Sequence, residues 1–418
     1  MSPVIITLLF LAFAIVMFIF EKIPLGLTAT IVAVGLNVTG VLSASDTFAG
    51  YVNSNVILCV GMFVVGQALF ETGMAHKIGG LVTRFAKSER ILITAIMVIV
   101  GVMSGFLSNT GTAAVLIPVV CGIADKSGYS RGKLLMPLVF AAALGGNLSI
   151  IGAPGNLMGI DALNNLGIQT GFFEYIAVGA PMLVVGILYF VFIGYRFLPD
   201  SKGEGSAEDQ ADYSSVPRWK QTTSLVVLIV VIFAMIFEEQ IGIKLQVSAC
   251  IGAAFLVLTG VISEKAALQS IDLKVVLLFG GSLALAKALE TTGAGSLIAD
   301  TIVSALGENP NPIILLLVIF IVGCTLTNFM SNTATTALMV PIAVSLAQSL
   351  GADPRSMVIA TVISCSCAYA TPIGMPANTM VVGLGGYKFN DYVKSGLPLI
   401  GVSFVICMVL LPVLYPFY

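Results

Sequence analysis

Three adjacent small polar residues, Ser108, Asn109 and Thr110, lie inside an otherwise apolar stretch, and the same tripeptide returns at 331–333. Each copy has a proline ten residues after its serine. Such polar groups are costly in lipid unless they face something polar. Their oxygens can hold a cation, and a helix that begins beside them can attract an anion. Two copies at matching positions therefore predict one binding site built from both halves of the chain.

A second pair of motifs, of the form Gly-x-Pro-x-Asn, follows the tripeptides at 152–156 and 374–378. Glycine and proline at these places predict helices that are interrupted within the membrane, where carbonyl groups become free for a cation. The sequence has no acidic residue in or beside either tripeptide or either Gly-x-Pro-x-Asn motif. A bound cation would thus be held by neutral oxygens, which favours an alkali ion over a divalent one. The charge of that cation would then help to attract an anion.

The composition is that of an integral membrane protein. Hydrophobic residues make up 58%, charged residues only 10%, and the mean hydropathy is +1.04, whereas a soluble chain has about 25% charged residues. The apolar runs are long and unbroken, so we expect helical spans rather than a β-barrel. The net charge of −2 comes with no large basic patch, so we expect no nucleic-acid partner. Since Met1-Ser2-Pro3 is not a basic leader, we interpret the first apolar run as a span rather than a cleaved signal.

The residue types argue against an enzyme. The chain has one histidine, His76, and neither a paired acid nor a nucleophile–base arrangement is evident. Its seven cysteines lie in apolar segments without a Cys-x-x-Cys motif, as expected of core residues. Lys287, inside a predicted span, is either a functional charge or a partner of Glu290.

Apolar segments of about 20 residues, the length that a membrane helix needs, recur in the same order in both halves. In the first half they cover 3–20, 23–43, 54–75, 91–124, 133–163 and 173–195. In the second half they cover 221–238, 243–262, 272–290, 312–349, 357–385 and 395–416. We therefore predict an all-α polytopic protein of two repeats, residues 1–197 and 221–418, joined by a polar cytoplasmic linker at 198–220.

The distribution of lysine and arginine predicts how these segments cross the membrane. Basic residues flank 91–124 on both sides, so both flanks should be cytoplasmic and this stretch should be a re-entrant hairpin. With a second hairpin at 312–349 and broken helices at 133–163 and 357–385, each repeat has five crossings. Of the 19 Lys and Arg, 16 then fall on the cytoplasmic side. The two repeats are accordingly inverted, and both termini are predicted to be external at the inner (plasma) membrane.

At these motifs the chain resembles the divalent anion:sodium symporter family of the ion transporter superfamily, which carries di- and tricarboxylates and sulfate. The resemblance covers nearly the whole chain. It implies a homodimer in the lipid bilayer, with a scaffold domain and a transport domain that moves as an elevator. It also implies that sodium (Na+) is the coupling ion and that the substrate is a small anion.

The resemblance further implies roles for individual residues. The first sodium site would use Ser104, Ser108, Asn109 and a carbonyl near Leu148, and the second Thr327, Asn332 and carbonyls near Met330 and Ala370. The substrate would contact Asn109, Thr110, Ser149, Asn332, Thr333 and Thr371.

Two features depart from the family pattern. Members often have Thr-Pro-Pro-Asn where this chain has Ala-Pro-Gly-Asn and Met-Pro-Ala-Asn, and longer members have one more N-terminal span.

We predict a sodium-coupled symporter of a C4-dicarboxylate such as succinate, malate or fumarate. The alternatives are a sulfate or tricarboxylate symporter, a sodium/proton antiporter and an arsenite-type exporter. An antiporter or exporter of this kind usually needs a titratable acid at mid-membrane, and the central segments offer only Asp161, at one end.

Overall fold

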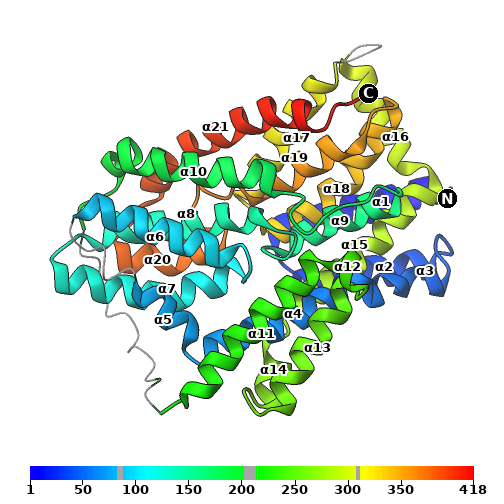
Figure 1. The fold of residues 1–418 in the computed structure, drawn as a ribbon. Coiled ribbons are helices and arrows are strands. Elements are labelled where there is room, and N and C mark those ends of the chain that lie inside the picture. Colours follow the sequence, from blue (N-terminus) through cyan, green and yellow to red (C-terminus); the bar gives the residue numbers. More distant parts are fainter. Residues whose placement is uncertain (82–87, 202–212, 214, 307–310) are drawn as a thin grey trace.

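The computed structural model describes residues 1–81, 88–201, 213, 215–306 and 311–418, and every regular element in these ranges is a helix (Figure 1). The prediction of an all-α fold is therefore confirmed. Arg84 and Lys87 of the predicted basic loop, and most of the predicted linker 198–220, lie outside the described residues.

The helices of the two halves follow one another in the same order. The first half has the following elements: α1 (Pro3–Phe20), α2 (Leu25–Val38), α3 (Ala44–Ala49), η1 (Gly50–Val52), α4 (Ser54–Glu71), α5 (Met74–Gly80), α6 (Glu89–Ser104), α7 (Asn109–Ser127), α8 (Arg131–Gly145), η3 (Gly146–Leu148), α9 (Pro154–Asn165), α10 (Ile176–Phe192) and η4 (Gly194–Phe197). The second half has these: α11 (Arg218–Ile236), α12 (Glu238–Ile241), α13 (Leu245–Leu258), α14 (Glu264–Ser270), α15 (Leu273–Thr292), α16 (Ala294–Leu306), α17 (Pro312–Thr327), α18 (Asn332–Ser349), α19 (Pro354–Ser366), α20 (Pro376–Gly385) and α21 (Phe389–Leu414).

Several of these helices are long and apolar enough to cross a membrane by themselves. Among the described residues they are Pro3–Phe20, Ala44–Glu71, Arg218–Ile236 and Phe389–Leu414, where Ala44–Glu71 counts α3, η1 and α4 as one continuous segment. Shorter apolar helices accompany them. The predicted hairpins contain two helices each, α6 with α7 and α17 with α18, joined by short turns. The predicted broken helices consist of α8 followed by α9 and of α19 followed by α20, with irregular backbone in between.

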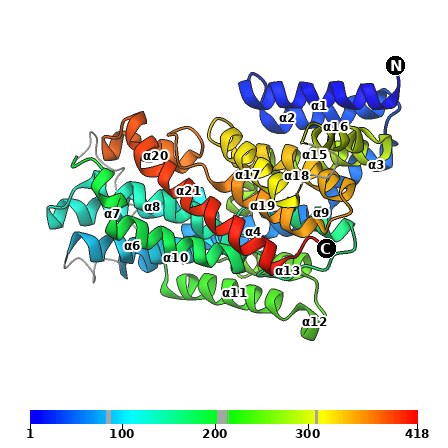
Figure 2. The ribbon, with the colours of Figure 1, turned by 90° about the horizontal axis from the view of Figure 1, so that it is seen from above.

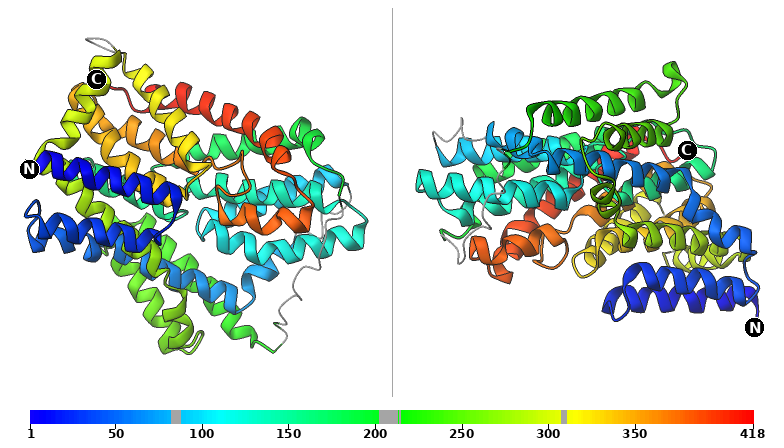
Figure 3. Two further views of the ribbon diagram at one scale, coloured as in Figure 1. Left: turned by 180° about the vertical axis from the view of Figure 1, so that it is seen from behind. Right: turned by 90° about the horizontal axis from the view of Figure 1, so that it is seen from below.

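One group of helices interlocks the two halves. The first-half helix α2 packs against the second-half helix α15, and in the matching arrangement α13 packs against α4. Both crossings have a glycine in close contact with the partner helix: Gly281 of α15 faces Ala29, and Gly61 of α4 faces Ala249. Figures 2 and 3 show α1 and α2 at one edge of the molecule and α11 at the opposite edge. We call α1–α4, α11 and α13–α15 the frame.

The remaining long helices, α6–α10 and α17–α21, form a second group, which we call the central unit. Its helices α8 and α19 are buried on almost every side. This agrees with the apolar run of α8 after its first turn, whereas α19 mixes apolar residues with small buried hydroxyls. Helices α10 and α21 run side by side along this unit (Figure 1). The polar tripeptides and both helix breaks thus lie in the unit whose centre is most deeply buried.

The short helices α3, α5, α14 and α16 are absent from the predicted spans. They are too short or too polar to stand out as membrane segments. The start of α5 and of α16 is nevertheless marked in the sequence, because Gly73 and Gly293 occupy matching positions and both adopt a left-handed conformation, with φ of 75° and 76°. Lys287 of α15 lies on an exposed face, where its Nζ is 3.0 Å from Glu290 Oε2, so the pair with Glu290 is the reading that the structure supports.

The frame contacts give a stability prediction. A Cβ atom at Gly281 would lie 2.5 Å from the Ala29 carbonyl oxygen, which belongs to rigid backbone. We expect Gly281→Leu to cost about 1–3 kcal/mol or more, as overpacking does, and to lower the midpoint of thermal unfolding in detergent by several degrees. The matched control is Gly401→Leu in α21, because a Cβ atom at Gly401 would meet no atom of another element within 4 Å. Equal effects of both substitutions would contradict the packing described here.

Candidate functional site

Each polar tripeptide begins a helix at the centre of the protein. Ser108 precedes α7, and its hydroxyl accepts a hydrogen bond from Gly111 N at 2.9 Å. Ser331 precedes α18 and accepts from Ala334 N at 3.2 Å. Serine is favoured at this position because its oxygen pairs one of the free N–H groups of the first turn. Ser108, which was predicted as a sodium ligand, and its counterpart Ser331 therefore both act as helix caps in the structure.

The first half-site is a cluster of oxygens around the Asn109 side chain. Ser104 Oγ donates to Asn109 Oδ1 at 2.6 Å and also lies 2.7 Å from the carbonyl oxygen of Ala142. The same amide atom of Asn109 lies 3.1 Å from the Ala142 oxygen and 3.2 Å from the Gly152 oxygen. The hairpin of α6 and α7, the helix α8 before the first break and the Gly-x-Pro-x-Asn motif at 152–156 thus meet at the Asn109 side chain.

The second half-site repeats this arrangement atom for atom. Thr327 Oγ1 donates to Asn332 Oδ1 at 2.7 Å and also lies beside the carbonyl oxygen of Cys365. The same amide atom of Asn332 lies 3.2 Å from the Cys365 oxygen and 3.3 Å from the Gly374 oxygen. The sequence offsets between equivalent residues are 222 or 223. The matched tripeptides therefore have matched surroundings.

The orientation of the two amides decides what each cluster can hold. With the nitrogen toward the carbonyls, the amide donates hydrogen bonds to them. With the oxygen toward them, four oxygens converge while a single hydroxyl proton lies among them. Oxygens crowd in this way around a cation, as in carbonyl-lined ion filters. Turning one amide thus exchanges a self-paired network for a cluster of oxygens of the kind that a cation prefers, because an amide has a donor end and an acceptor end.

The asparagines of the two Gly-x-Pro-x-Asn motifs brace the helix breaks. Asn156 Nδ2 donates to the carbonyl oxygens of Gly146 and Ser149, both at 2.7 Å. Asn378 Nδ2 donates to those of Ala368 at 2.7 Å and Thr371 at 3.0 Å. Both asparagines are fully buried. Each brace thus pairs two carbonyls that the interrupted helix leaves without an intrahelical partner.

Two tyrosines of the following helices complete the braces. Tyr175 Oη donates to the Asn156 carbonyl oxygen at 2.8 Å, and Tyr392 Oη to that of Asn378 at 2.7 Å. Among the described residues, neither Asn156 Oδ1 nor Asn378 Oδ1 has a hydrogen-bond partner. Each half-site therefore retains one buried amide oxygen as a free acceptor.

Ser149 and Thr371, predicted to contact substrate, are buried and already engaged. Ser149 Oγ donates to the Gly105 carbonyl oxygen at 2.5 Å, and Thr371 Oγ1 donates to that of Asn328 at 2.6 Å. Both hydroxyls also accept a backbone N–H from their own loop. In this conformation they tie each hairpin turn to its helix break, and contact with a substrate remains a prediction.

The other predicted residues fall into two groups. Asn109, Thr110, Asn332 and Thr333 are partly exposed at the helix starts, as a residue that meets a ligand must be. The second group was predicted to offer backbone carbonyls: Leu148 and Ala370 lie in the helix breaks, and their role as sodium ligands remains a prediction. Met330, of the same group, has its side chain in an apolar cluster with α1, α2 and α15, and the role of its carbonyl also remains a prediction. The sequence pattern did not single out the carbonyls of Ala142, Gly152, Cys365 and Gly374, since a carbonyl leaves no mark in residue type.

Asn328 breaks the symmetry of the two half-sites and was also missed from sequence. Its amide donates to the Cys324 and Cys367 carbonyls at 2.7 and 3.2 Å, and its Oδ1 accepts from Ala370 N at 2.8 Å. The matching residue is Gly105, where a Cβ would lie 3.0 Å from the Leu148 Cβ. The second half-site is thus fastened by a side chain that the first half-site lacks.

Four helix N-termini, those of α7, α9, α18 and α20, begin at the tripeptides and the helix breaks. Each carries a partial positive charge of about half an elementary unit, so the region favours an anion. The two half-sites are neighbours across the packing of α9 on α18, where Gly155 approaches Thr336. No group of three or more His, Cys, Asp or Glu that could hold a metal occurs among the described residues. Neutral oxygens and helix termini are therefore the chemistry that this region offers.

The protein belongs to the citrate transporter family (CitMHS), whose model matches residues 15–363 and again 236–417. The all-helical fold with its long apolar helices agrees with a membrane transporter. Family and architecture together define a transporter and not an enzyme.

Relatives match over most of their length. A transporter of Haemophilus influenzae is 28% identical over 92% of this chain and 86% of its own. The sodium-dependent high-affinity dicarboxylate transporter 3 of Caenorhabditis elegans is 25% identical over 90% and 77%. The sodium-dependent dicarboxylate transporter SdcS of Staphylococcus saprophyticus is 24% identical over 95% and 83%.

Two solved structures share the fold. The YdaH transporter of Alcanivorax borkumensis superposes with a TM-score of 0.69 at 16% identity, over 99% of this chain and 98% of its own. MtrF of Neisseria gonorrhoeae superposes with a TM-score of 0.63 at 14% identity, over 99% and 95%. At these identities the likeness concerns the fold alone.

The braces give a prediction about stability. In Asn156→Asp or Asn378→Asp, two buried carbonyls lose their donor and face a carboxylate oxygen. An unpaired buried polar group costs about 1–3 kcal/mol, so we expect a large fall in the thermal unfolding midpoint for both variants. Asn390→Asp is the control, because Asn390 is exposed at the start of α21. If the two brace variants unfold no earlier than the control, the braces do not support the helix breaks.

Proposed function

We propose that the protein is a sodium-coupled symporter of a small divalent anion, most readily a C4-dicarboxylate such as succinate, malate or fumarate. The observation that carries the proposal is the pair of matched oxygen clusters around Asn109 and Asn332. Both consist of neutral oxygens, which suit a monovalent cation. The helix N-termini beside them suit an anion.

Coupling follows from the two charges in one small region. A divalent anion amid low-polarity protein is costly to desolvate. Two sodium ions in the two half-sites would offset its charge, so anion and cations would bind more readily together than apart. The partly exposed Asn109, Thr110, Asn332 and Thr333 then lie between the cations and the substrate carboxylates.

The choice of a dicarboxylate draws support from relatives named sodium-dependent dicarboxylate transporters in two organisms. A tricarboxylate is the second candidate, since the family model is described as that of a citrate transporter. Sulfate carries the same two charges and would satisfy the same helix termini. All three are anions, and the site would recognise their charge more than their shape.

The predicted arrangement in the membrane is part of the proposal. Figure 1 places both termini at one end of the molecule and α5 at the other, as expected if both termini are external. In this scheme the frame is the scaffold of a homodimer in the plasma membrane, and the central unit carries the site across the membrane as an elevator. The proposed domains are repeats at 1–197 and 221–418 with a cytoplasmic linker at 198–220.

The oxygen clusters can be tested by transport. Asn109→Ala and Asn332→Ala each remove the amide at the centre of one cluster. We expect sodium-driven uptake of radiolabelled succinate into proteoliposomes to fall at least about tenfold in each variant, the equivalent of about 1.4 kcal/mol in binding. Thr259→Ala, at the exposed end of α13, is the control.

Uptake that needs no sodium and survives both substitutions would overturn the proposal. Transport driven by a pH gradient without any organic anion would indicate a sodium/proton antiporter instead. Thermal-shift measurements on the purified parent with succinate, citrate and sulfate identify the anion, because the ligand that stabilises only when sodium is present is the substrate.

Asn328 provides a prediction about the second half-site. Asn328→Gly reproduces the residue found at the matching position of the first half. Since it removes hydrogen bonds that hold the Ala370 backbone, worth about 1 kcal/mol each, we expect the half-saturating sodium concentration to rise about fivefold or more. The maximal uptake rate should change less than the sodium requirement. Thr325→Ala, exposed on the same helix, should change neither. A lower maximal rate at unchanged sodium dependence would assign Asn328 a purely structural role.

A further inference from the structure

Asp161 is a buried carboxylate at the boundary between the central unit and the frame. It lies on α9, and only 4% of its surface is exposed. Its Oδ1 accepts hydrogen bonds from Asn53 Nδ2 at 2.7 Å and Asn55 Nδ2 at 3.1 Å, both at the start of frame helix α4. Its Oδ2 accepts from Asn165 Nδ2 of its own helix at 3.0 Å. A charge buried in this way depends on such donors, because it has left water.

The donors from α4 are held in place by the helix start itself. Asn53 Oδ1 accepts from Asn55 N at 2.8 Å, so its amide nitrogen is directed toward Asp161. The N-terminus of α4 adds a partial positive charge beside the carboxylate. The contact is therefore a specific link between two groups of helices that are far apart in sequence.

This link exists in one half only. By the offset of 222, the residue that matches Asp161 is Gly383 of α20, which has no side chain to offer. Helix α9 packs on α4, whereas α20 does not pack on α15 in the corresponding way. Met158 of α9 is accordingly 4% exposed, while the matching Met380 of α20 is 41% exposed.

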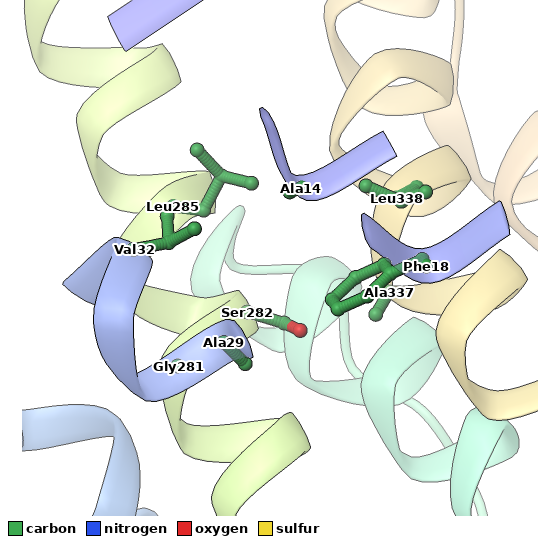
Figure 4. Close-up of a pocket in the computed structure, with 9 residues that line it drawn as sticks. All are labelled: Ala14, Phe18, Ala29, Val32, Gly281, Ser282, Leu285, Ala337 and Leu338. Carbon is green, nitrogen blue, oxygen red and sulfur yellow. The ribbon is translucent and has the colours of Figure 1, made fainter. Parts of the chain in front are cut away.

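The hairpin helices show the same imbalance. Helix α18 packs on α15, whereas its counterpart α7 does not pack on α4 to a similar extent. A small apolar cavity lies at this seam, bordered by Phe18 of α1, Val32 of α2, Leu285 of α15 and Leu338 of α18 (Figure 4). Its lining offers one hydroxyl, that of Ser282, and this hydroxyl already donates to the Leu278 carbonyl. The cavity is thus part of the contact between frame and central unit and not a substrate site.

Two repeats of one pattern would make matched contacts if the central unit lay midway in the frame. Here α9 packs on α4 and α18 packs on α15, whereas α7 and α20 do not pack on the frame to a similar extent. The central unit is therefore displaced toward one of two equivalent positions. Exchange of the matched contacts would produce the other position, which is how repeat transporters alternate their access.

We propose that Asp161, Asn53 and Asn55 form a latch that closes the site on the side of the α4 N-terminus and must break when the site opens there. By the proposed topology that side is external. The latch deepens the proposed function and rests on it. Because the matching residue is Gly383, the opposite position has no equivalent link, so the latch biases the protein toward the conformation seen here.

The experiment follows the accessibility of matched positions. Cys250 is exposed, and the other six cysteines are buried. Cys250→Ser therefore gives a parent protein whose native cysteines do not react with the maleimide while it is folded. Met158→Cys and Met380→Cys are then introduced separately and treated with a membrane-impermeant maleimide in right-side-out and inside-out vesicles. We expect the cysteine at 380 to react from the cytoplasmic side and the cysteine at 158 to be protected.

Breaking the latch should exchange this pattern. With Asn55→Ala or Asp161→Asn added, external labelling at 158 should rise at least fivefold and cytoplasmic labelling at 380 should fall. Asn165→Ala is the matched control, since it removes a hydrogen bond to the same carboxylate from within α9. Protection at 158 that persists in both latch variants, or an equal rise in the control, would overturn the proposal.

The assay separates the latch from misfolding and from the proposed function. An unfolded variant would also label its six buried native cysteines, and in that event the milder Asn55→Ala decides the outcome. Labelling uses neither sodium nor substrate. A changed labelling pattern therefore supports the latch even if succinate is not transported, and unchanged labelling overturns it even if succinate is.

Discussion

The structure depends on how backbone groups are paired where helices stop inside the protein. Breaks between α8 and α9 and between α19 and α20 leave carbonyls that no water in a bilayer could pair. Asn156 and Asn378 each donate to two of them. Because these braces satisfy part of the broken backbone, other oxygens of Ala142, Gly152, Cys365 and Gly374 can converge on the amides of Asn109 and Asn332. The proposed binding chemistry thus depends on interrupted helices whose free carbonyls are partly paired by these two asparagines.

The two half-sites differ in how their helix breaks are fastened and in how they contact the frame. The Asn328 side chain accepts a hydrogen bond from the Ala370 N–H in the second helix break. Its counterpart Gly105 has no side chain, and Leu148 packs directly against it. The frame contacts are unequal as well, since Asp161 joins α9 to α4 and has no counterpart on α20. Two nearly equivalent positions with one extra link are the elements of a two-state device, because a few hydrogen bonds suffice to bias such an equilibrium.

Much of this could be predicted from the sequence because the features were carried by residue type and spacing. Long apolar runs predicted an all-helical membrane fold, and helices did form at the predicted places. Helices α6 and α7 cover the predicted 91–124 and extend two to three residues beyond it at each end, and α17 and α18 lie inside 312–349. The paired tripeptides led to Asn109 and Asn332, which the structure surrounds with matched oxygens. The short helices α5 and α16 were missed, since so few turns carry little periodic signal; the glycines at 73 and 293 were the available clue.

The sequence by itself determined the class of protein, the repeat and the residues that begin the central helices, because these follow from hydropathy, charge and recurrence. Only the tertiary structure decided which carbonyls face each amide, since carbonyl positions depend on how the chain returns to the same point. It also decided that Ser149 and Thr371 tie loops together, and that Asp161 meets Asn53 and Asn55 across a separation of more than a hundred residues. Residue type and spacing identify the polar side chains, and the packing of the helices determines which groups they contact.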